Sequence, residues 1–294
     1  MKRFVAALIA LALAACQREA PGPGPQVALW AITASPDRAA PVCGWILGTI
    51  HALPPGTAWR RPSIDRALAD AGELVMEIGE PLDATIAGKS LARLAMTPGL
   101  PPPSARLDPA GAKALIAAYR KLGVDDARFA DEESWAVALQ LSAIASQKAG
   151  ADADAGVEPQ LRAAMAGKPM AGLETIDGQF AIFDRLDARA QTRLLGDVAR
   201  EVNEARDEDT DMLALWLKGD ELGLAAQANS DFLADPALHE ALLTGRNRAW
   251  TDRIDALLHE GKRPLIAVGA AHVVGRDGLP AMLRARGWTV KRVF

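Results

Sequence analysis

GWILGTIH, residues 44–51, is an apolar run that ends in a glycine-x-x-histidine signature. The same arrangement returns near the other end of the chain, in PLIAVGAAH at residues 264–272. Each apolar run predicts a buried β-strand, and each histidine follows its strand across a turn of small residues. Open α/β sheets place their ligand sites at strand ends. If the two strands are neighbours, His51 and His272 meet at one edge of the sheet.

The N-terminal part of the chain predicts further strands around the first signature. Residues 27–33 and 44–50 are strand-like runs separated by Ser35-Pro36-Asp37, a turn-rich segment that favours a hairpin. Residues 62–71 then carry apolar side chains at helical spacing, and residues 74–78 form a third apolar run. The order strand, helix, strand favours a parallel crossover.

The C-terminal part repeats this pattern, so the two ends of the chain predict one sheet. Residues 264–268 and 289–293 are strand-like and lie on either side of a short helical segment at residues 279–286. The middle, residues 91–260, is mostly amphipathic helix, with residues 168–173 as one further strand. We therefore predict an α/β fold. Its mixed, largely parallel sheet is built from the N- and C-terminal strands and is capped by the long helical middle segment.

The first residues predict export and lipid anchoring. A basic start is followed by an uncharged run that is too short to span a bilayer, and then by Cys16. LAAC at residues 13–16 resembles the lipobox of bacterial lipoproteins, in which the cysteine is lipidated. We expect a signal peptide over residues 1–15, a Pro/Gly-rich tether over residues 16–26 and a single domain over residues 27–294.

Anchoring through Cys16 makes the lipid bilayer an expected partner and places the domain in the bacterial cell envelope, facing the periplasm. Gln17 after the cysteine resembles the class directed to the outer membrane. The alternative is an ordinary secretory signal that is cleaved and leaves no anchor. With Cys16 assigned to lipid, Cys43 has no intramolecular partner, so no disulfide is expected even in an oxidising compartment.

The charge distribution argues against a nucleic-acid partner. The formal net charge is −4, and the charged residues are spread along the chain without a basic stripe. Half of the residues are hydrophobic, which is normal for a globular domain. We therefore expect a globular domain without a nucleic-acid partner.

Three side chains with metal-ligand chemistry follow the predicted strands. His51 and His272 come after two of them, and Glu77 lies at the end of the strand at residues 74–78. Two neutral imidazoles and a carboxylate suit a divalent metal with an open coordination position, which would lower the pKa of a bound water. The alternative from the residues alone is two hydrogen-bonded structural histidines and a solvated Glu77.

Several motifs, in this order, resemble the TraB/GumN family, which includes the TIKI metalloproteases and is similar to the erythromycin esterase and ChaN-like group. The resemblance extends from about Leu29 to Val293. The segments that carry it are residues 45–51, Glu77 after its apolar run, residues 172–175 with Gln179, Arg246-Asn247 with Trp250, and residues 268–272 with Gly275 and Gly278.

The resemblance implies a metal-dependent peptide or amide hydrolase. In the TIKI branch two glycine-x-x-histidine motifs and a glutamate are associated with metal-dependent peptide cleavage, and here these would be His51, His272 and Glu77. The implied cofactor is a divalent metal ion, with Mn, Co or Zn as candidates. Glu174 could be a further metal ligand, and the implied substrate is an unidentified peptide or small molecule.

Four further residues receive roles from the resemblance. Glu174 or Glu77 would act as the general base, and Gln179 would orient the base or contact substrate. Arg246 would stabilise an oxyanion or, together with Asn247, hold a substrate carboxylate. The alternative is structural, because Arg246 could equally form a helix cap or an ion pair with Glu174.

Two other functions stay open at this stage. The similarity to ChaN-like proteins allows a non-catalytic lipoprotein that binds haem, iron or another ligand through the paired histidines. The similarity to erythromycin esterases allows metal-free hydrolysis, in which a histidine activates water directly. The other two histidines, His239 and His259, are predicted to be surface or boundary residues, and Tyr119 is predicted to lie in the core.

Overall fold

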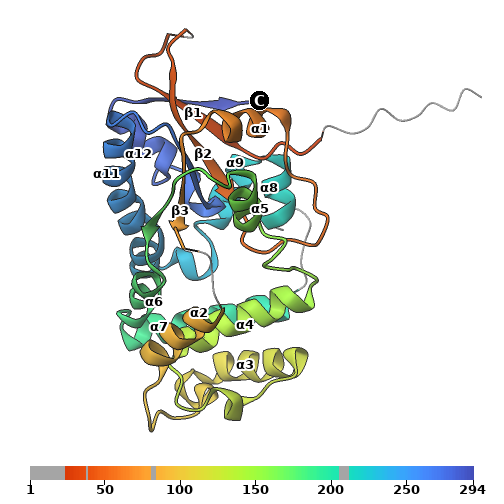
Figure 1. Cartoon of the computed structure of the whole chain (residues 1–294). Helices are drawn as coiled ribbons and strands as arrows, with labels where there is room; N and C mark the ends of the chain where they lie inside the picture. Colours follow the sequence, from red (N-terminus) through yellow and green to blue (C-terminus); the bar gives the residue numbers. More distant parts are fainter. Residues whose placement is uncertain (1–23, 38, 81–83, 205–211) are drawn as a thin grey trace, which may run out of the picture.

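The α/β class predicted from the sequence is confirmed by a computed structural model, which describes residues 24–37, 39–80, 84–204 and 212–294. One six-stranded sheet has the strand order β4-β3-β5-β2-β1-β6 (Figure 1). The strands are β1 (Leu29–Thr33), β2 (Val42–Thr49), β3 (Glu73–Ile78), β4 (Met170–Glu174), β5 (Pro264–Gly269) and β6 (Thr289–Val293). The sheet is therefore built mainly from the two ends of the chain, as expected.

The sheet is mixed, with a parallel centre. Strands β4, β3, β5 and β2 are parallel neighbours, whereas β1 pairs antiparallel with both β2 and β6. The β1–β2 pair is the predicted hairpin. In the β2–β5 pair, Gly48 lies opposite Val268 and Thr49 lies opposite Gly269, so both histidine signatures leave the sheet at the same edge. Continuous apolar runs form these central strands because helices cover both faces.

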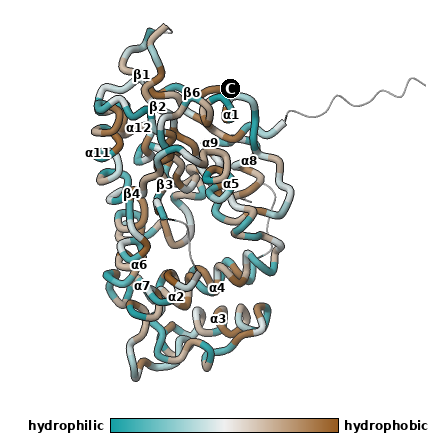
Figure 2. The backbone as a smooth tube through the Cα atoms, viewed as in Figure 1, coloured by the Kyte–Doolittle hydropathy of each residue, from teal (hydrophilic) through white to brown (hydrophobic). Residues whose placement is uncertain are grey.

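Six helices bury apolar side chains in the core that surrounds the sheet, here called the sheet core. They are α1 (Pro62–Asp70), α5 (Val157–Ala164), α8 (Met212–Lys218), α9 (Glu221–Gln227), α11 (Gly245–His259) and α12 (Leu279–Ala285). Four of them belong to the middle segment, which therefore caps the sheet in part. Figure 2 shows the apolar backbone positions concentrated between these layers.

The remaining helices of the middle segment build a second core, here called the helical core, among the described residues. It consists of α2 (Ala84–Ala95), α3 (Pro109–Leu122), α4 (Ser134–Lys148) and α7 (Ala188–Asn203), with α6 (Ile176–Asp184) and α10 (Pro236–His239) packed beside them. In Figure 1 these helices form a layer below the sheet. Tyr119 is buried here, as predicted. The middle segment therefore caps the sheet with some of its helices, while the others form a separate core.

Aspartate side chains cap two of these helices. Asp108 caps α3 by accepting a hydrogen bond from the Gly111 N–H, and Gly123 ends the same helix in the left-handed conformation. Asp235 caps α10 in the same way. One π-helical turn (Glu240–Thr244, η4) then joins α10 to α11, just before Arg246. Short 3-10 turns complete the fold at η1 (Pro103–Arg106), η2 (Asp126–Phe129), η3 (Asp231–Ala234) and η5 (Ala270–Val273).

The predicted signal peptide, the predicted lipidation site Cys16 and most of the predicted tether lie outside the described residues. Within the described ranges, no helix is both long enough and apolar enough to span a bilayer.

Candidate active site

The carboxyl ends of four parallel strands bring the predicted site residues together. Glu77 is on β3, Glu174 is the last residue of β4, and His51 follows β2. His272 follows β5 within the 3-10 turn η5, and Arg246 reaches the same edge from α11. Parallel strands place their carboxyl ends at one edge of a sheet, which explains why residues so far apart in sequence meet.

Arg246 lies at the centre of this cluster. Its Nε donates to Glu174 Oε1 at 2.9 Å, and its Nη2 donates to Glu174 Oε2 at 2.8 Å and to Glu77 Oε2 at 2.7 Å. Its Nη1 lies 3.2 Å from both the Leu242 carbonyl oxygen and His272 Nε2. These five contacts use all five N–H groups of the guanidinium.

The surroundings of Arg246 favour its charge strongly. The side chain is 10% exposed and its guanidinium lies 4.5 Å from the centre of the Trp250 ring. Burial opposes the charge, but the hydrogen bonds and charges of Glu174 and Glu77 outweigh it and raise the pKa of Arg246. The ion pair with Glu174 is the structural alternative considered from the sequence. To bind an oxyanion, Arg246 must exchange one of these contacts.

Glu77 is buried, and one of its two carboxylate oxygens accepts two side-chain hydrogen bonds. Its Oε2 accepts from Arg246 and, at 3.1 Å, from Gln179 Nε2, while Oε1 accepts from the Gly269 N–H at 2.7 Å. Burial opposes ionisation, but the charges of His272, His51 and Arg246 and the Gly269 N–H hold the pKa of Glu77 at about 2. Glu77 is therefore a carboxylate at neutral pH, and Gln179 helps to orient it.

His272 is held neutral by its partners. Asn247 Nδ2 donates to the Asp277 carbonyl oxygen at 2.7 Å, so Asn247 Oδ1, 2.7 Å from His272 Nδ1, acts as an acceptor. His272 Nδ1 thus carries the proton, and its Nε2 presents a lone pair to Arg246. Burial lowers the pKa of His272 to about 3. Asn247 is itself buried, at 1% exposed.

His51 is the exposed member of the cluster. Its side chain is 67% exposed, and its Nδ1 lies 2.8 Å from Oε1 of Glu158, which also accepts from Thr49 Oγ1 at 2.5 Å. Partial burial of the ring lowers the pKa of His51, but the hydrogen bond and charge of Glu158 and the charge of Glu77 raise it to about 9. Burial opposes ionisation of Glu158, yet its bond to His51 lowers its pKa.

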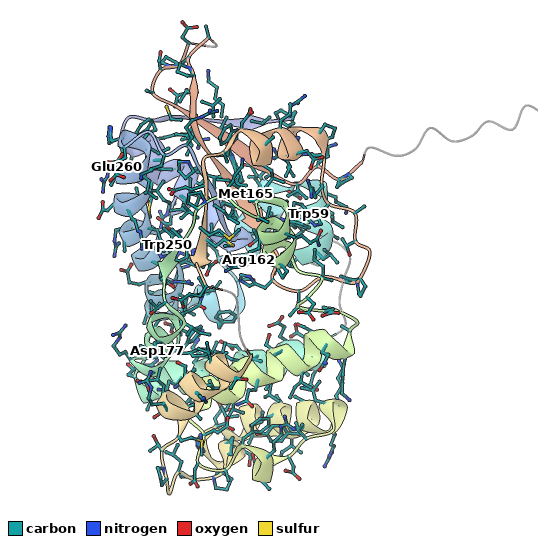
Figure 3. The ribbon with its side chains drawn as sticks, viewed as in Figure 1. Trp59, Arg162, Met165, Asp177, Trp250 and Glu260 are labelled. Atoms are coloured by element: carbon teal, nitrogen blue, oxygen red, sulfur yellow. The ribbon has the colours of Figure 1, made fainter. Side chains whose placement is uncertain are left out.

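Glu158 was not predicted from the sequence. It lies in the first turn of α5 and meets His51 across a separation of 107 residues, and it is one of 37 acidic residues in the chain. No local motif distinguishes it from the others. Arg162, one turn further along α5, donates to the carbonyl oxygens of Ile78, Gly79 and Glu80 and so fixes the end of β3 (Figure 3).

The three predicted metal ligands converge around Gly269. A Cβ atom at this glycine would lie 3.2 Å from Glu77 Oε1, 3.6 Å from His51 Nε2 and 3.7 Å from a ring carbon of His272. The missing side chain therefore leaves a small space between the three groups. Both histidines are bonded through Nδ1 to an oxygen, as metal-binding histidines commonly are.

The donor set is correct in kind for a metal, but its present arrangement does not fit one. Among the described residues, no group of three His, Cys, Asp or Glu side chains could hold a metal ion. His272 Nε2 lies 4.0 Å from Glu77 Oε1 and faces the Arg246 guanidinium, which occupies the position of a cation. Metal binding at His51, Glu77 and His272 therefore stays a prediction.

The remaining histidines lie away from this cluster. His259 is exposed on α11 and packs against Trp288, whereas His239 is mostly buried next to Asp277. Cys43 is a free thiol and is only partly buried. None of these side chains contacts Glu77 or Arg246 in the described structure.

Fold and site together define a mixed α/β protein whose parallel sheet edge carries a buried carboxylate–arginine–imidazole cluster with one exposed histidine. The chain belongs to the TraB/PrgY/gumN family, whose model matches residues 28–292.

Two relatives are both called uncharacterized protein YbaP, from Escherichia coli (strain K12) and Shigella flexneri. Each is 29% identical over 171 residues, which cover 56% of this chain and 61% of the relative. The match thus spans less than two thirds of their length. No solved structure matches the chain.

Proposed function

We propose that this protein is a hydrolase of amide or peptide bonds in which His51 exchanges protons with the substrate. The observation that carries this proposal is the position of His51, which is exposed, held by Glu158 and turned through Nε2 towards Glu77. An oriented imidazole beside a fixed carboxylate is the basis of acid–base catalysis.

The opposite protonation states of His51 and Glu77 suggest their roles. Environments that move the pKa values of two neighbouring groups apart divide the acid and base functions between them. Glu77 Oε1 accepts one hydrogen bond from Gly269 and has a lone pair left for a water molecule. As that water attacks the carbonyl carbon, Glu77 takes its proton, and protonated His51 gives a proton to the leaving nitrogen. The acid and the amine are released, and the proton on Glu77 returns to His51.

Activity of His51 variants on a panel of amide and peptide substrates tests this proposal. We expect His51→Ala to lower kcat/KM by about a hundredfold or more, because general acid–base groups contribute factors of that order. The matched control is His259→Ala, since His259 is also exposed but lies away from the site. Equal activity of the two variants would contradict the proposal.

A metal-dependent hydrolase is the second candidate. It is favoured by the two histidines that are anchored through Nδ1 and turned towards the space at Gly269. His51, Glu77 and His272 would hold a divalent ion such as Mn, Co or Zn, and Arg246 would have to release His272. Activity that survives exhaustive chelation supports the metal-free proposal. Loss of activity, with recovery on stoichiometric metal rebinding that His51→Ala and His272→Ala abolish, supports the metal.

The haem- or iron-binding alternative lacks a supporting contact. His272 is buried, and its two ring nitrogens face Asn247 and Arg246, so the paired histidines do not both offer a free nitrogen. A titration of the purified protein with haem checks this alternative through the Soret band.

We further propose that Cys16 is lipidated and anchors the domain in the periplasm, at the outer membrane. The support is the LAAC sequence before the Pro/Gly-rich segment. Metabolic labelling with a fatty acid, followed by membrane fractionation, should place the label in the outer membrane. Cys16→Ser should lose the label, and retention of label by that variant would contradict the assignment.

A further inference from the structure

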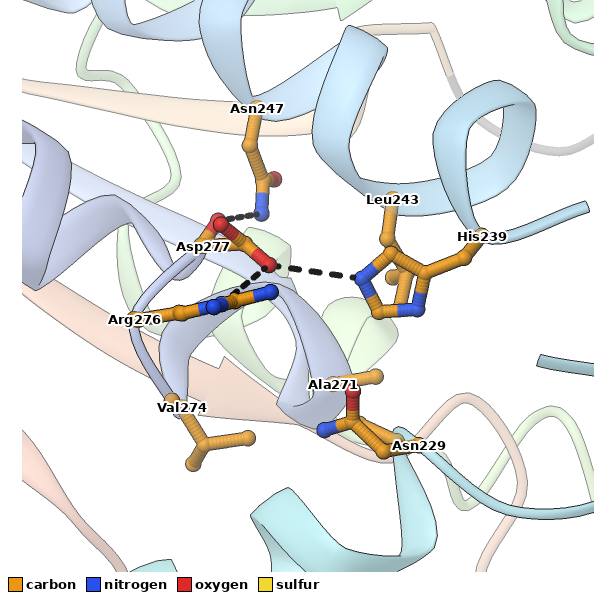
Figure 4. A pocket seen from close by; sticks show the side chains of 10 residues that line it. Asn229, His239, Leu243, Asn247, Ala271, Val274, Arg276 and Asp277 are labelled. Atoms are coloured by element: carbon orange, nitrogen blue, oxygen red, sulfur yellow. Dashed lines mark hydrogen bonds and ion pairs between the residues drawn. The ribbon is translucent and has the colours of Figure 1, made fainter. Parts of the chain in front are cut away.

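A small cavity lies behind the turn that carries His272. Its volume is about 200 Å³, and Figure 4 shows the side chains that line it. The cavity is lined by Ala228, Asn229, His239, Leu243, Asn247, Ala271, Val274, Gly275, Arg276 and Asp277. The cavity lies outside the cluster around Arg246, but Asn247 borders both. None of these residues takes part in the proposed hydrolysis, although Asn247 contacts His272.

The hydrogen bonds of His239 leave two acceptors facing each other in this cavity. His239 Nδ1 lies 3.2 Å from the Leu233 carbonyl oxygen, which can only accept, so Nδ1 carries the proton. In the neutral ring, Nε2 is then an acceptor, and it lies 3.6 Å from Oδ2 of Asp277. That separation is longer than a hydrogen bond. A donor placed beside this pair, at hydrogen-bond distance from each atom, would satisfy both of them.

The other lining residues indicate which chemical groups a ligand of this cavity would carry beside the donor. Asn229 Nδ2 already donates to the Ala225 carbonyl oxygen, so its amide oxygen is a further acceptor. Leu243, Val274, Ala228 and Ala271 supply an apolar wall. Arg276 Nε lies 3.5 Å from Asp277 Oδ2, and the Arg276 side chain is 94% exposed. Because exposed ion pairs are weak, this guanidinium can turn towards an anion.

We propose that this cavity binds a free α-amino acid with an aliphatic side chain. The ammonium group donates to both Asp277 Oδ2 and His239 Nε2 from one side, the aliphatic group packs on the apolar wall, and the carboxylate pairs with Arg276. A cavity of about 200 Å³ has room for one small molecule of this size. Asn247 is hydrogen-bonded to both His272 Nδ1 and the Asp277 carbonyl oxygen, so this residue connects the proposed ligand site with the candidate active site.

Calorimetric titration of the full folded domain with L-leucine tests the proposal, together with two ligands that each lack one charge. N-acetyl-L-leucine has no ammonium group, and L-leucinamide has no carboxylate. We expect saturable binding of L-leucine, at least about tenfold weaker binding of L-leucinamide, and no binding of N-acetyl-L-leucine, since hydrogen bonds to charged groups are the strong ones.

The protein variants are Asp277→Asn and a matched exposed control, Asp252→Asn on α11. Asp277→Asn should weaken L-leucine binding at least about tenfold, whereas Asp252→Asn should leave it unchanged. Circular dichroism spectra that match the wild type show that both variants are folded. The ring signals of His239 in NMR should shift on addition of L-leucine.

Three results would overturn the proposal. They are no saturable binding of L-leucine, binding that Asp277→Asn does not weaken, and binding that leaves the His239 signals in place. This experiment does not depend on the proposed hydrolase activity, because it measures binding only. A protein that binds L-leucine but hydrolyses no substrate would support the binding proposal and contradict the hydrolase proposal.

Discussion

At the scale of the residue, His51 and Glu158 form a pair whose charge state should report on the site. Their contact raises the pKa of His51 from 6.5 to about 9. Replacing Glu158 by Gln removes the charge that favours the imidazolium, so the titration midpoint of His51 should fall towards 6.5. NMR of the ring signals, recorded in buffer treated with chelator, measures this midpoint. A midpoint unchanged by the substitution would show that Glu158 does not control it.

The sign of the pH effect on stability follows from the same pair. The folded pKa of His51 lies above the unfolded one, so its contribution is complete below about pH 6.5 and is lost as the pH rises through about 9. The free energy of unfolding of the wild type should therefore exceed that of Glu158→Gln at low pH and approach it at high pH. Urea unfolding at about pH 6 and about pH 10 measures the two differences. A difference that grows with pH would contradict this assignment.

Arg246 is the residue on which the electrostatics of the buried cluster depend. Arg246→Met leaves Glu77 and Glu174 as uncompensated buried carboxylates, and breaking such a pair costs about 3–5 kcal/mol. Arg248→Met on the same helix is the matched control, because Arg248 is 59% exposed and its ion pair with Glu240 should contribute only about 0–1 kcal/mol. Urea unfolding compares the two variants. Equal losses of unfolding free energy would show that the buried ion pairs of Arg246 contribute no more than the exposed ion pair of Arg248.

At the scale of the element, close contact between β3 and β4 sets the distance between the two carboxylates. A Cβ atom at Gly172 would lie 2.3 Å from the Gly79 backbone nitrogen. Gly172→Ala must therefore push β4 away from β3, with a cost of about 1–3 kcal/mol. Gly88→Ala is the control, because Gly88 lies in α2 with open space around it and should gain about 0.5–1 kcal/mol. Thermal melting of both variants decides. A neutral Gly172→Ala would show that the strands tolerate separation.

The elements that the sequence predicts well are those whose signal is local. The strands around the two histidine signatures are continuous apolar runs, and Asp108 and Asp235 mark helix starts with their own side chains. The same local logic predicts that His51, Glu77 and His272 reach one edge, because each follows a strand of a parallel sheet. Pairings across long sequence separations are different. Glu158 meets His51 through the packing of α5, which no spacing in the sequence records.

At the scale of the whole molecule, the division into two cores could not be predicted from the sequence pattern either. Amphipathic spacing predicts that a helix has an apolar face, but it does not say which partner covers that face. Helices α5 and α11 cover the sheet, whereas α3, α4 and α7 cover one another. Among the described residues, Leu233 is the side chain that packs against both cores. The candidate site belongs mainly to the sheet core, with Gln179 contributed from α6.

The two cores should respond separately to damage. Trp135 is fully buried in the helical core, and Trp135→Ala should remove about 3–5 kcal/mol of local stability. Hydrogen exchange should then speed up in α3, α4 and α7, while β2 and β5 stay protected, because few side chains connect the cores. The His51 ring signals should stay at their wild-type positions, since their partners lie at the sheet edge. Faster exchange of all elements together would instead show one cooperative unit over residues 27–294. In that case the helical core would also stabilise the candidate site.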